Sequence, residues 1–268
     1  MPARAYEDNP GEARSERRPP KSVLGKVGLI LGAFRDGDFS LSLSELTART
    51  GVAKATVHRL CQELVACELL EREGSNYRLG LQLYEIGLRA PRQRTLRDAA
   101  RPVMENLAQS LDNPVNLSVP NGTELLCIEN AGTHRNRARA SVGGRHMELY
   151  STAAGKLTLA LLPDQYPLSG VAPTIRRRTP RTLTAARLAD ELVRIREQGH
   201  ATEFEEYRPG YLAVAVPVRG GDEAFVGALS VVAPTAAGNV PRILRELTAG
   251  SRAITARLNV LEAYRGPR

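Results

Sequence analysis

Two short helix patterns joined by a glycine constrain the fold of this chain more than any other feature. The first begins at Ser42-Leu43-Ser44-Glu45, which has the spacing of a capping box: the Ser42 hydroxyl bonds the third amide and Glu45 reaches back. Gly51 then ends the helix. After a three-residue connection a new helical stripe starts, made of Val57, Leu60, Cys61, Leu64 and Val65. Two helices joined by a tight glycine turn predict a helix-turn-helix.

Residues on both sides extend this pair of helices into a winged domain. Upstream, a helical stripe predicts a further helix from about Ser22 to near Asp36-Gly37, with the members Val27, Ile30, Leu31 and Phe34. Downstream, residues 69–72 and 77–79 have the composition of short strands, and the turn-rich tetrapeptide Glu73-Gly74-Ser75-Asn76 separates them. We expect these strands to form the hairpin of a wing.

The N-terminal half divides into three parts. Residues 1–21 are polar and rich in proline, without apolar periodicity, and are expected to be a flexible N-terminal arm. Residues 22–90 form the expected winged helix-turn-helix DNA-binding domain, which closes with a short helix at about 83–89. Helical periodicity resumes over residues 91–112, a helical linker, where Pro102 should kink the helix or mark its first turn.

Residues 113–268 predict a second domain in which helices pack on an antiparallel sheet. Asn-Gly at 121–122, between two apolar runs, is a strong hairpin signal, and residues 211–219 and 225–232 repeat the hairpin pattern around glycines. Helical patterns separate or follow these strands, at residues 153–162, 185–198 and 243–261. The predicted fold class is therefore α+β, with an N-terminal winged helix-turn-helix and a C-terminal mixed α/β domain.

Length and charge limit the possible functions. A chain of 268 residues is long enough for about two domains of roughly 100–200 residues each. The formal net charge is +8, but residues 1–90 hold 13 Lys and Arg against 12 Asp and Glu, whereas the remainder holds 24 against 17. DNA binding by the first domain therefore rests on its residue pattern, because bulk charge does not support it.

Several other classes of protein are excluded by composition. No apolar run approaches the roughly 18 residues that a membrane helix needs, and the N-terminus does not resemble a signal peptide, so we expect a cytoplasmic protein. The three cysteines, Cys61, Cys67 and Cys127, do not form a disulfide framework, and the four histidines are scattered. We therefore expect reduced thiols, no metal site and no cofactor.

The polar face of the second helix of the helix-turn-helix carries residue types that read DNA. It offers cations, a hydroxyl and an imidazole ring to base edges and phosphates. With neighbours on the preceding helix and the wing, the predicted DNA-binding residues are Ser44, Lys54, Ala55, Thr56, His58, Arg59, Ser75, Asn76 and Arg78. The alternative is a solvated polar face on a small helical bundle, which the capping box, the glycine turn and the hairpin together disfavour.

Motifs in both domains resemble the IclR family of bacterial transcriptional regulators. In the first domain these are Ser22-Val23-Leu24, Gly51-Val52-Ala53-Lys54-Ala55-Thr56-Val57-His58-Arg59-Leu60 and Tyr77-Arg78-Leu79-Gly80. In the second they are Thr152-Ala153-Ala154-Gly155-Lys156, Glu205-Glu206-Tyr207-Arg208-Pro209-Gly210, Ala215-Val216-Pro217-Val218 and Gly227-Ala228-Leu229-Ser230-Val231. The resemblance runs from about residue 22 to 262. It implies a GAF-like second domain with a small-molecule pocket, and dimers that commonly pair into tetramers.

The resemblance also implies which residues form the effector pocket. A helix that starts near Ser151 presents free amides to an anion, an arrangement that helix-terminus physics supports independently. Glu203 stands where the family often has Asp, and Ser230 matches a family hydroxyl. Ala213, Val232 and Tyr150 instead replace a common Cys, Ser and His. With apolar neighbours, the expected effector-binding residues are Met147, Leu149, Tyr150, Ser151, Thr152, Ala153, Ala154, Glu203, Leu212, Ala213, Ser230 and Val232.

These features predict a ligand-responsive transcriptional regulator that binds operator DNA as a homo-oligomer, a dimer or a dimer of dimers. The apolar face of residues 83–107 is the expected dimer seam, because a helix tethered between domains needs a partner for its stripe. Ala213 and Val232 leave apolar pocket walls, which suit a small organic acid with a flat aromatic ring, benzoate- or hydroxybenzoate-like. Ser230 or Glu203 would hold the ring's polar substituent. Alternatively, Ala213 and Val232 point into the core and leave the pocket unaffected.

Two other classes of function stay open at this point. A metabolite-binding sensor module would use its winged helix for protein contacts instead of DNA contacts. An enzyme would draw on the acidic cluster Glu203, Glu205 and Glu206, but no nucleophile, metal set or second His lies nearby in the sequence, so we expect no enzymatic activity. Nothing in the sequence distinguishes a repressor from an activator.

Overall fold

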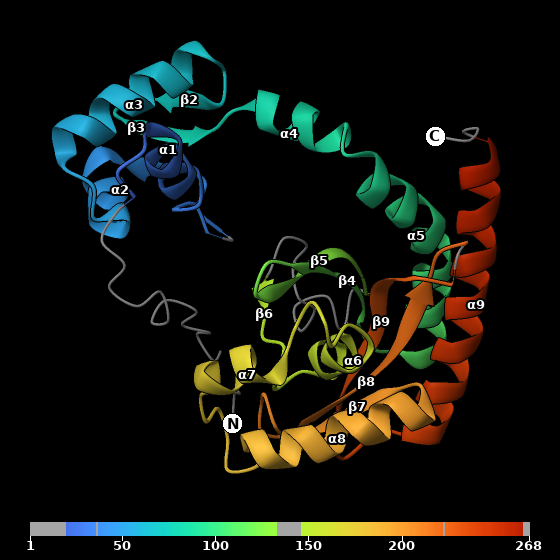
Figure 1. The fold of residues 1–268 in the computed structure, drawn as a ribbon. Coiled ribbons are helices and arrows are strands. Elements are labelled where there is room, and N and C mark those ends of the chain that lie inside the picture. Colours follow the sequence, from blue (N-terminus) through green and yellow to red (C-terminus); the bar gives the residue numbers. More distant parts are fainter. Residues whose placement is uncertain (1–19, 36, 133–145, 222, 265–268) are drawn as a thin grey trace, which may run out of the picture. The chain divides into compact units, whose positions relative to one another are not determined.

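The computed structural model describes residues 20–35, 37–132, 146–221 and 223–264. Residues 1–19, most of the expected N-terminal arm, lie outside the described residues. The chain forms two compact units, Met1–Arg89 and Ala90–Arg268. Together they give the mixed α+β fold that the sequence predicts, with a helix-turn-helix unit followed by an antiparallel-sheet unit (Figure 1).

The first unit is a winged helix-turn-helix built on α2 (Leu43–Thr50) and α3 (Lys54–Ala66). The predicted capping box is present: Ser42 accepts from the Glu45 amide, and Glu45 accepts from the Ser42 amide at 2.8 Å. Gly51 ends α2 with a φ of +65°, a left-handed conformation that glycine adopts at no steric cost. The predicted stripe of α3 turns inward, with Val57, Leu60, Cys61 and Leu64 all buried.

The wing is a hairpin of β2 (Leu70–Glu73) and β3 (Asn76–Leu79). Its strands pair in antiparallel register, and β1 (Leu41–Ser42), which the sequence analysis missed, pairs with β3 on the other side. Tyr77 of β3 is fully buried beneath the helices, so the wing contributes to the core of the unit. The unit closes with α4 (Leu81–Leu88).

The predicted end of the first helix is wrong. α1 (Val23–Leu31) stops at the Gly32 cap, several residues before Asp36-Gly37. The following loop is held by Asp38, whose carboxylate accepts from the Arg35 amide at 2.7 Å and pairs with the Arg49 guanidinium on α2. Phe34 still packs against the core from this loop, which is why it extends the helical stripe in the sequence.

The second unit is a six-stranded antiparallel sheet in the order β6-β5-β4-β9-β8-β7. The strands are β4 (Val115–Asn121), β5 (Glu124–Ala131), β6 (His146–Met147), β7 (Ala201–Phe204), β8 (Tyr211–Arg219) and β9 (Phe225–Pro234). The helices are α5 (Pro91–Leu111), α6 (Ala153–Leu161), α7 (Leu168–Val171), α8 (Ala185–Gln198) and α9 (Val240–Tyr264), with a short 3-10 turn at Ala172–Thr174. Both predicted hairpins are confirmed.

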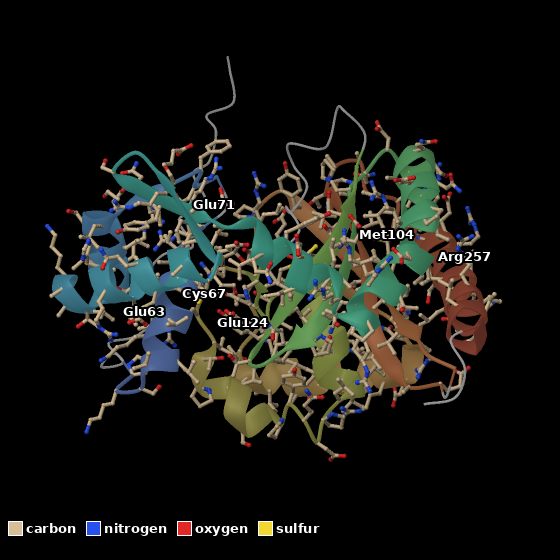
Figure 2. The ribbon with its side chains drawn as sticks, turned by 90° about the horizontal axis from the view of Figure 1, so that it is seen from above. Glu63, Cys67, Glu71, Met104, Glu124 and Arg257 are labelled. Carbon is tan, nitrogen blue, oxygen red and sulfur yellow. The ribbon has the colours of Figure 1, made fainter. Side chains whose placement is uncertain are left out.

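Each face of this sheet carries its own core. Alternate residues of β8 show the division: Val214 and Val216 pack with α5 and α9, whereas Ala213 and Ala215 pack with α6 and α8. Figure 1 shows α5 and α9 side by side on one face. Met104 of α5, labelled in Figure 2, is fully buried in that layer.

The helix expected as a linker belongs to the second unit and is already partnered there. α5 runs unbroken through Pro102, and its first turn begins at Pro91 instead. Its apolar stripe, which includes Leu96, Met104 and Leu107, is buried against the sheet and α9. The expected dimer seam over residues 83–107 is therefore wrong for this part of its length, because α9 of the same chain already covers it.

Within the described ranges, no helix is long and apolar enough to cross a membrane. The same residues hold no cluster of three or more His, Cys, Asp or Glu side chains arranged to bind a metal ion. Of the three cysteines, Cys61 and Cys127 are buried and Cys67 is exposed.

Candidate functional site

The first candidate site is the exposed side of α3. Lys54, Ala55 and Arg59 are exposed and Thr56 and His58 are half-buried, so the five predicted DNA-binding residues of this helix lie on its outer side. The N-cap residue Ala53 has no side chain to cap the helix, which leaves the first amides of α3 available. Uncapped amides and a nearby cation together form an anion-binding arrangement suited to phosphate.

A surface ion pair occupies the guanidinium of Arg59. Its Nη1 pairs with Glu63 one helical turn further along α3, and both side chains are more than half exposed. Glu63, labelled in Figure 2, thus adds a negative charge to the outer side of α3. An exposed pair of this kind is worth about 0.2–1 kcal/mol, so a phosphate or a base edge can replace Glu63 at little cost.

The predicted residues of the wing are partly engaged in contacts within the unit. Ser75 is exposed in the Gly74-Ser75 turn, while Asn76 donates to the Ser40 hydroxyl at 3.3 Å. Arg78 binds Glu71 through Nε at 2.8 Å, and Glu71 also accepts from the Leu81 amide at 3.1 Å. Arg78 therefore helps to fix the start of α4 against the wing, a structural role that the sequence analysis did not foresee.

Ser44, the remaining member of the predicted DNA-binding set, is exposed in the first turn of α2. The capping box fixes this turn, since Ser42 and Glu45 satisfy each other's backbone amides.

The second candidate site surrounds the first turn of α6. Thr152 is its N-cap and accepts from the Gly155 amide at 3.0 Å, while its hydroxyl donates to the Glu148 carbonyl at 2.7 Å. A Cβ at Gly155 would lie 2.5 Å from the carbonyl oxygens of Glu148 and Leu149. Glycine is therefore required here, because the preceding segment packs directly on the backbone of the helix.

The predicted residues around this turn do come together. Ser151 is fully buried, and Leu149, Tyr150, Ala153 and Ala154 belong to the core between α6, α8 and the sheet. Met147 packs against the same core from β6. No described residue accepts a hydrogen bond from the amide of Ala153 or Ala154, so both amides remain as donors at the positive end of the helix dipole.

The sheet supplies the opposite wall through two rows of paired residues. Glu203, Ala213 and Val232 are neighbours across β7, β8 and β9, and the next row contains Ala215 and Ser230. Ala213, Ala215 and Val232 all face the core on the α6 side, which places the side chains of both rows there. The predicted residues Glu203, Ala213, Ser230 and Val232 are thus on one face.

Leu212 does not belong to this wall. It lies on the opposite face of the sheet, in the core formed with α5 and α9. Because side chains alternate along a strand, Leu212 and Ala213 cannot line the same pocket. The expectation that both do so is corrected by the strand geometry.

Glu203 is a buried carboxyl with an unusual proton affinity. The chain turns sharply at Glu205, where φ is +57°, and Glu203 Oε1 accepts from the amides of Glu206 and Tyr207 at 2.7 and 2.9 Å. Burial raises the pKa of Glu203 to about 7 and outweighs these hydrogen bonds, which lower it. The group therefore changes its charge near neutral pH.

A buried ion pair holds the loop that contains these glutamates. Lys156 of α6 is fully buried, and its Nζ donates to Glu206 Oε1 at 2.6 Å and lies 3.6 Å from Glu191 Oε1 on α8. Glu205 pairs with Arg181 at 3.4 Å. Each glutamate of the acidic cluster is therefore engaged in holding the structure, which argues against an acid–base role for it.

Two polar residues of β4 were missed by the sequence analysis. Asn116 pairs with Ser230 in the sheet and accepts from the Asn130 side chain at 2.6 Å. Ser118 is fully buried, and its hydroxyl has no hydrogen-bond partner among the described residues. The signal was present in the sequence, because these two polar residues alternate with Val115, Leu117 and Val119.

Comparison with known proteins assigns both units. Residues 23–74 match the family model described as the IclR helix-turn-helix domain, and residues 89–256 match the model described as bacterial transcriptional regulator IclR C-terminal. The chain is 30% identical over 221 residues to the HTH-type transcriptional regulator KdgR of Escherichia coli, which covers 80% of this chain and 82% of that protein. It is 31% identical over 203 residues to the HTH-type transcriptional regulator BhcR of Paracoccus denitrificans, and this match covers 73% of this chain and 71% of that protein.

A solved structure shows the same fold. The chain is similar to an IclR homologue from Microbacterium hydrocarbonoxydans complexed with 4-hydroxybenzoate, with a TM-score of 0.81 and 25% sequence identity. The match covers 88% of this chain and 99% of that one.

Proposed function

Because the chain belongs to the IclR family of transcriptional regulators, we propose that it binds operator DNA through α3 and the wing under the control of an aromatic carboxylate. The observation that carries this proposal is that one chain contains two candidate binding sites. One is an exposed, uncapped helix with cations, and the other is a helix terminus facing a mostly apolar sheet wall. The first suits a polyanion and the second a small organic anion.

The proposed DNA contacts divide into two kinds. We assign Thr56 and Arg59 to contacts with base edges; their position on the outer side of α3 close to its N-terminus supports this. Lys54 and the amides of the first turn contact phosphates, which positions the helix without reading sequence. Ser75 and its neighbours on the wing would contact the adjacent backbone.

The proposed ligand follows from the walls of the second site. Free amides at the start of α6 favour a carboxylate, whereas Ala213, Val232 and Leu149 offer apolar surface that suits a ring. Ser230 and Glu203 stand on the sheet as polar partners for a ring hydroxyl. The structural similarity to a protein complexed with 4-hydroxybenzoate supports the same ligand class.

We further propose that the protein works as a homodimer or a dimer of dimers. One winged helix contacts too little DNA for tight specific binding, and a dimer that reads two half-sites solves this geometrically. The apolar side chains of α4 provide a surface for the partner, since Leu81, Tyr84 and Ile86 are 63%, 65% and 49% exposed.

The test of this function is operator binding in the presence and absence of ligand. Fluorescence anisotropy with labelled DNA from upstream of the protein's own gene should show nanomolar binding. Added 4-hydroxybenzoate should shift the affinity, whereas pyruvate and glyoxylate at the same concentration should not. A response to the small aliphatic acids without one to aromatic acids would contradict the ligand class, and absence of DNA binding would contradict the function.

A further inference from the structure

A segment between α7 and α8 connects two parts of the candidate ligand site. This segment, residues 175–182, is called the strap. At one end the Arg176 amide donates to the Tyr150 hydroxyl at 3.1 Å, next to the start of α6. At the other end Thr179 donates to the Glu205 carbonyl at 2.6 Å and Thr182 to the Glu206 carbonyl at 2.8 Å. The strap therefore spans from the start of α6 to the loop that follows Glu203.

Arg178 lies in the middle of the strap and points to the start of α6. Its Nε donates to Glu148 Oε1 at 2.9 Å, and its Nη2 donates to the same oxygen, so two guanidinium nitrogens bind this carboxylate. The guanidinium carbon lies 5.9 Å from the centre of the Tyr207 ring, which belongs to the loop after Glu203. Arg178 is thus a cation placed between the two segments that carry predicted effector-binding residues.

Glu148 links this cation to a buried hydroxyl. While Oε1 of Glu148 accepts from Arg178, its Oε2 accepts from Ser151 Oγ at 2.7 Å. Ser151 is fully buried directly before the N-cap of α6, so its hydroxyl has little access to water. A carboxylate of the protein itself therefore takes up both a guanidinium and a hydroxyl donor beside the helix terminus.

The donors around Glu148 are the ones that a carboxylate ligand needs. A guanidinium binds a carboxylate through two parallel hydrogen bonds, and a hydroxyl and free helix amides add further donors. The Arg178 side chain is 42% exposed, so a ligand can reach its guanidinium, whereas the Glu148 side chain is 18% exposed. A ligand carboxylate that replaces Glu148 keeps Arg178 paired, and the displaced Glu148 carboxylate must turn toward water.

We propose that Arg178 binds the carboxylate of the effector, and that Glu148 occupies this position in the ligand-free protein. The inference rests on the proposed function, because it concerns the ligand of the same site. Binding of the ligand moves the Glu148 carboxylate off Arg178, which loosens the attachment of the strap to the start of α6. Arg178 thereby determines specificity for an acid over its neutral analogue.

The test is calorimetric titration of 4-hydroxybenzoate into the full-length protein and four variants. Arg178→Gln should weaken binding by about tenfold or more, because it removes a charge-assisted two-pronged contact. Arg177→Gln is the matched control: it is the adjacent exposed residue, removes the same charge and has no ion pair with a described residue. It should change the affinity by less than about threefold. Glu148→Gln should strengthen binding, since it removes the competing charge and keeps an acceptor for Ser151.

The neutral analogue 4-hydroxybenzamide separates a direct contact from a structural effect. Arg178→Gln should leave its weak binding unchanged, whereas a damaged site would lose both ligands. Arg178→Lys keeps the charge without the two-pronged geometry and should fall between wild type and Arg178→Gln. If Arg177→Gln and Arg178→Gln weaken binding equally, or if Arg178→Gln does not weaken it, the role of Arg178 is refuted while the proposed function still stands. If the wild type binds no aromatic acid, the proposed ligand class fails as well.

Discussion

Arg59 carries the exposed guanidinium of α3, and its ion pair with Glu63 competes with DNA for this group. Arg59→Ala should weaken operator binding by about 1–3 kcal/mol while the melting temperature stays nearly unchanged, because the lost ion pair is exposed. Glu63→Gln should have the opposite effect on binding, since it releases Arg59 and removes a negative charge that faces the phosphates. Anisotropy titrations and thermal melts of both variants check this. Parallel losses of stability and affinity would show that Arg59 is structural.

Glu203 gives the second unit a pH-dependent stability. Its pKa is about 7 in the folded protein against an ordinary value of 4.5. Between these two pH values the folded state keeps a proton that the unfolded state has lost. The contribution of Glu203 to the free energy of unfolding is therefore complete below about pH 4.5. It decreases by about 3 kcal/mol as the pH rises from there to about 7. Glu203→Gln cannot titrate, so its stability relative to wild type should increase from pH 5 to 7.5. Urea unfolding at several pH values measures it, and a constant difference would refute the assignment.

At the scale of single elements, Gly155 makes the close packing of α6 possible. Gly155→Ala should destabilise the protein by about 1–3 kcal/mol, because the added methyl group meets two backbone carbonyl oxygens that have no flexible side chain to move. Gly170→Ala on α7 is the matched control: a Cβ there has no neighbour within 4 Å, so the change should be neutral or stabilise by about 0.4–1 kcal/mol. Chemical denaturation of both variants makes the comparison. Equal effects would mean that the segment before α6 yields easily.

The elements that could be predicted from the sequence are those with a strong period. α8 and β8 have the bounds that the pattern indicates, because helical and alternating stripes repeat over their whole lengths. β1 has two residues and no period, so nothing in the sequence marks it. The stripe of α1 continues past its true end because Phe34 reaches the core from a loop.

The candidate site was less predictable than the fold because tertiary packing assembles it. The family resemblance indicates the first turn of α6 and the rows on β7 and β9, but Leu212, which we added as an apolar neighbour, lies on the other face of β8. Glu148 and Arg178 are thirty residues apart on segments without a period, so their contact has no sequence signal. Lys156 lies within an apolar helix pattern, and its buried partners come from α8 and the loop after β7.

At the scale of the whole molecule, each unit folds around its own core, and ligand control of DNA binding requires that they act together. The apolar stripe of α5 cannot supply a seam between copies, because it is buried against the sheet and α9. α4 keeps exposed apolar side chains, which are Leu81, Tyr84 and Ile86, with Leu88 39% exposed at its end. Exposed apolar side chains on one short helix indicate a contact with another molecule. Under the proposed dimeric recognition of DNA, that molecule is a second copy of the chain.

This assignment of the seam to α4 predicts how assembly and DNA binding change together. The double variant Leu81→Ser with Tyr84→Ser should shift light scattering of the purified protein toward smaller species and weaken operator binding by about tenfold or more, because only one half-site is then held firmly. Its melting temperature should change little at high protein concentration, since both side chains are exposed within the chain. Val193→Ser is the matched control, because Val193 is an apolar residue of α8 with 46% exposure. If the double variant keeps the wild-type mass and affinity, the copies meet through another surface, and the exposed apolar side chains of α4 serve a different contact.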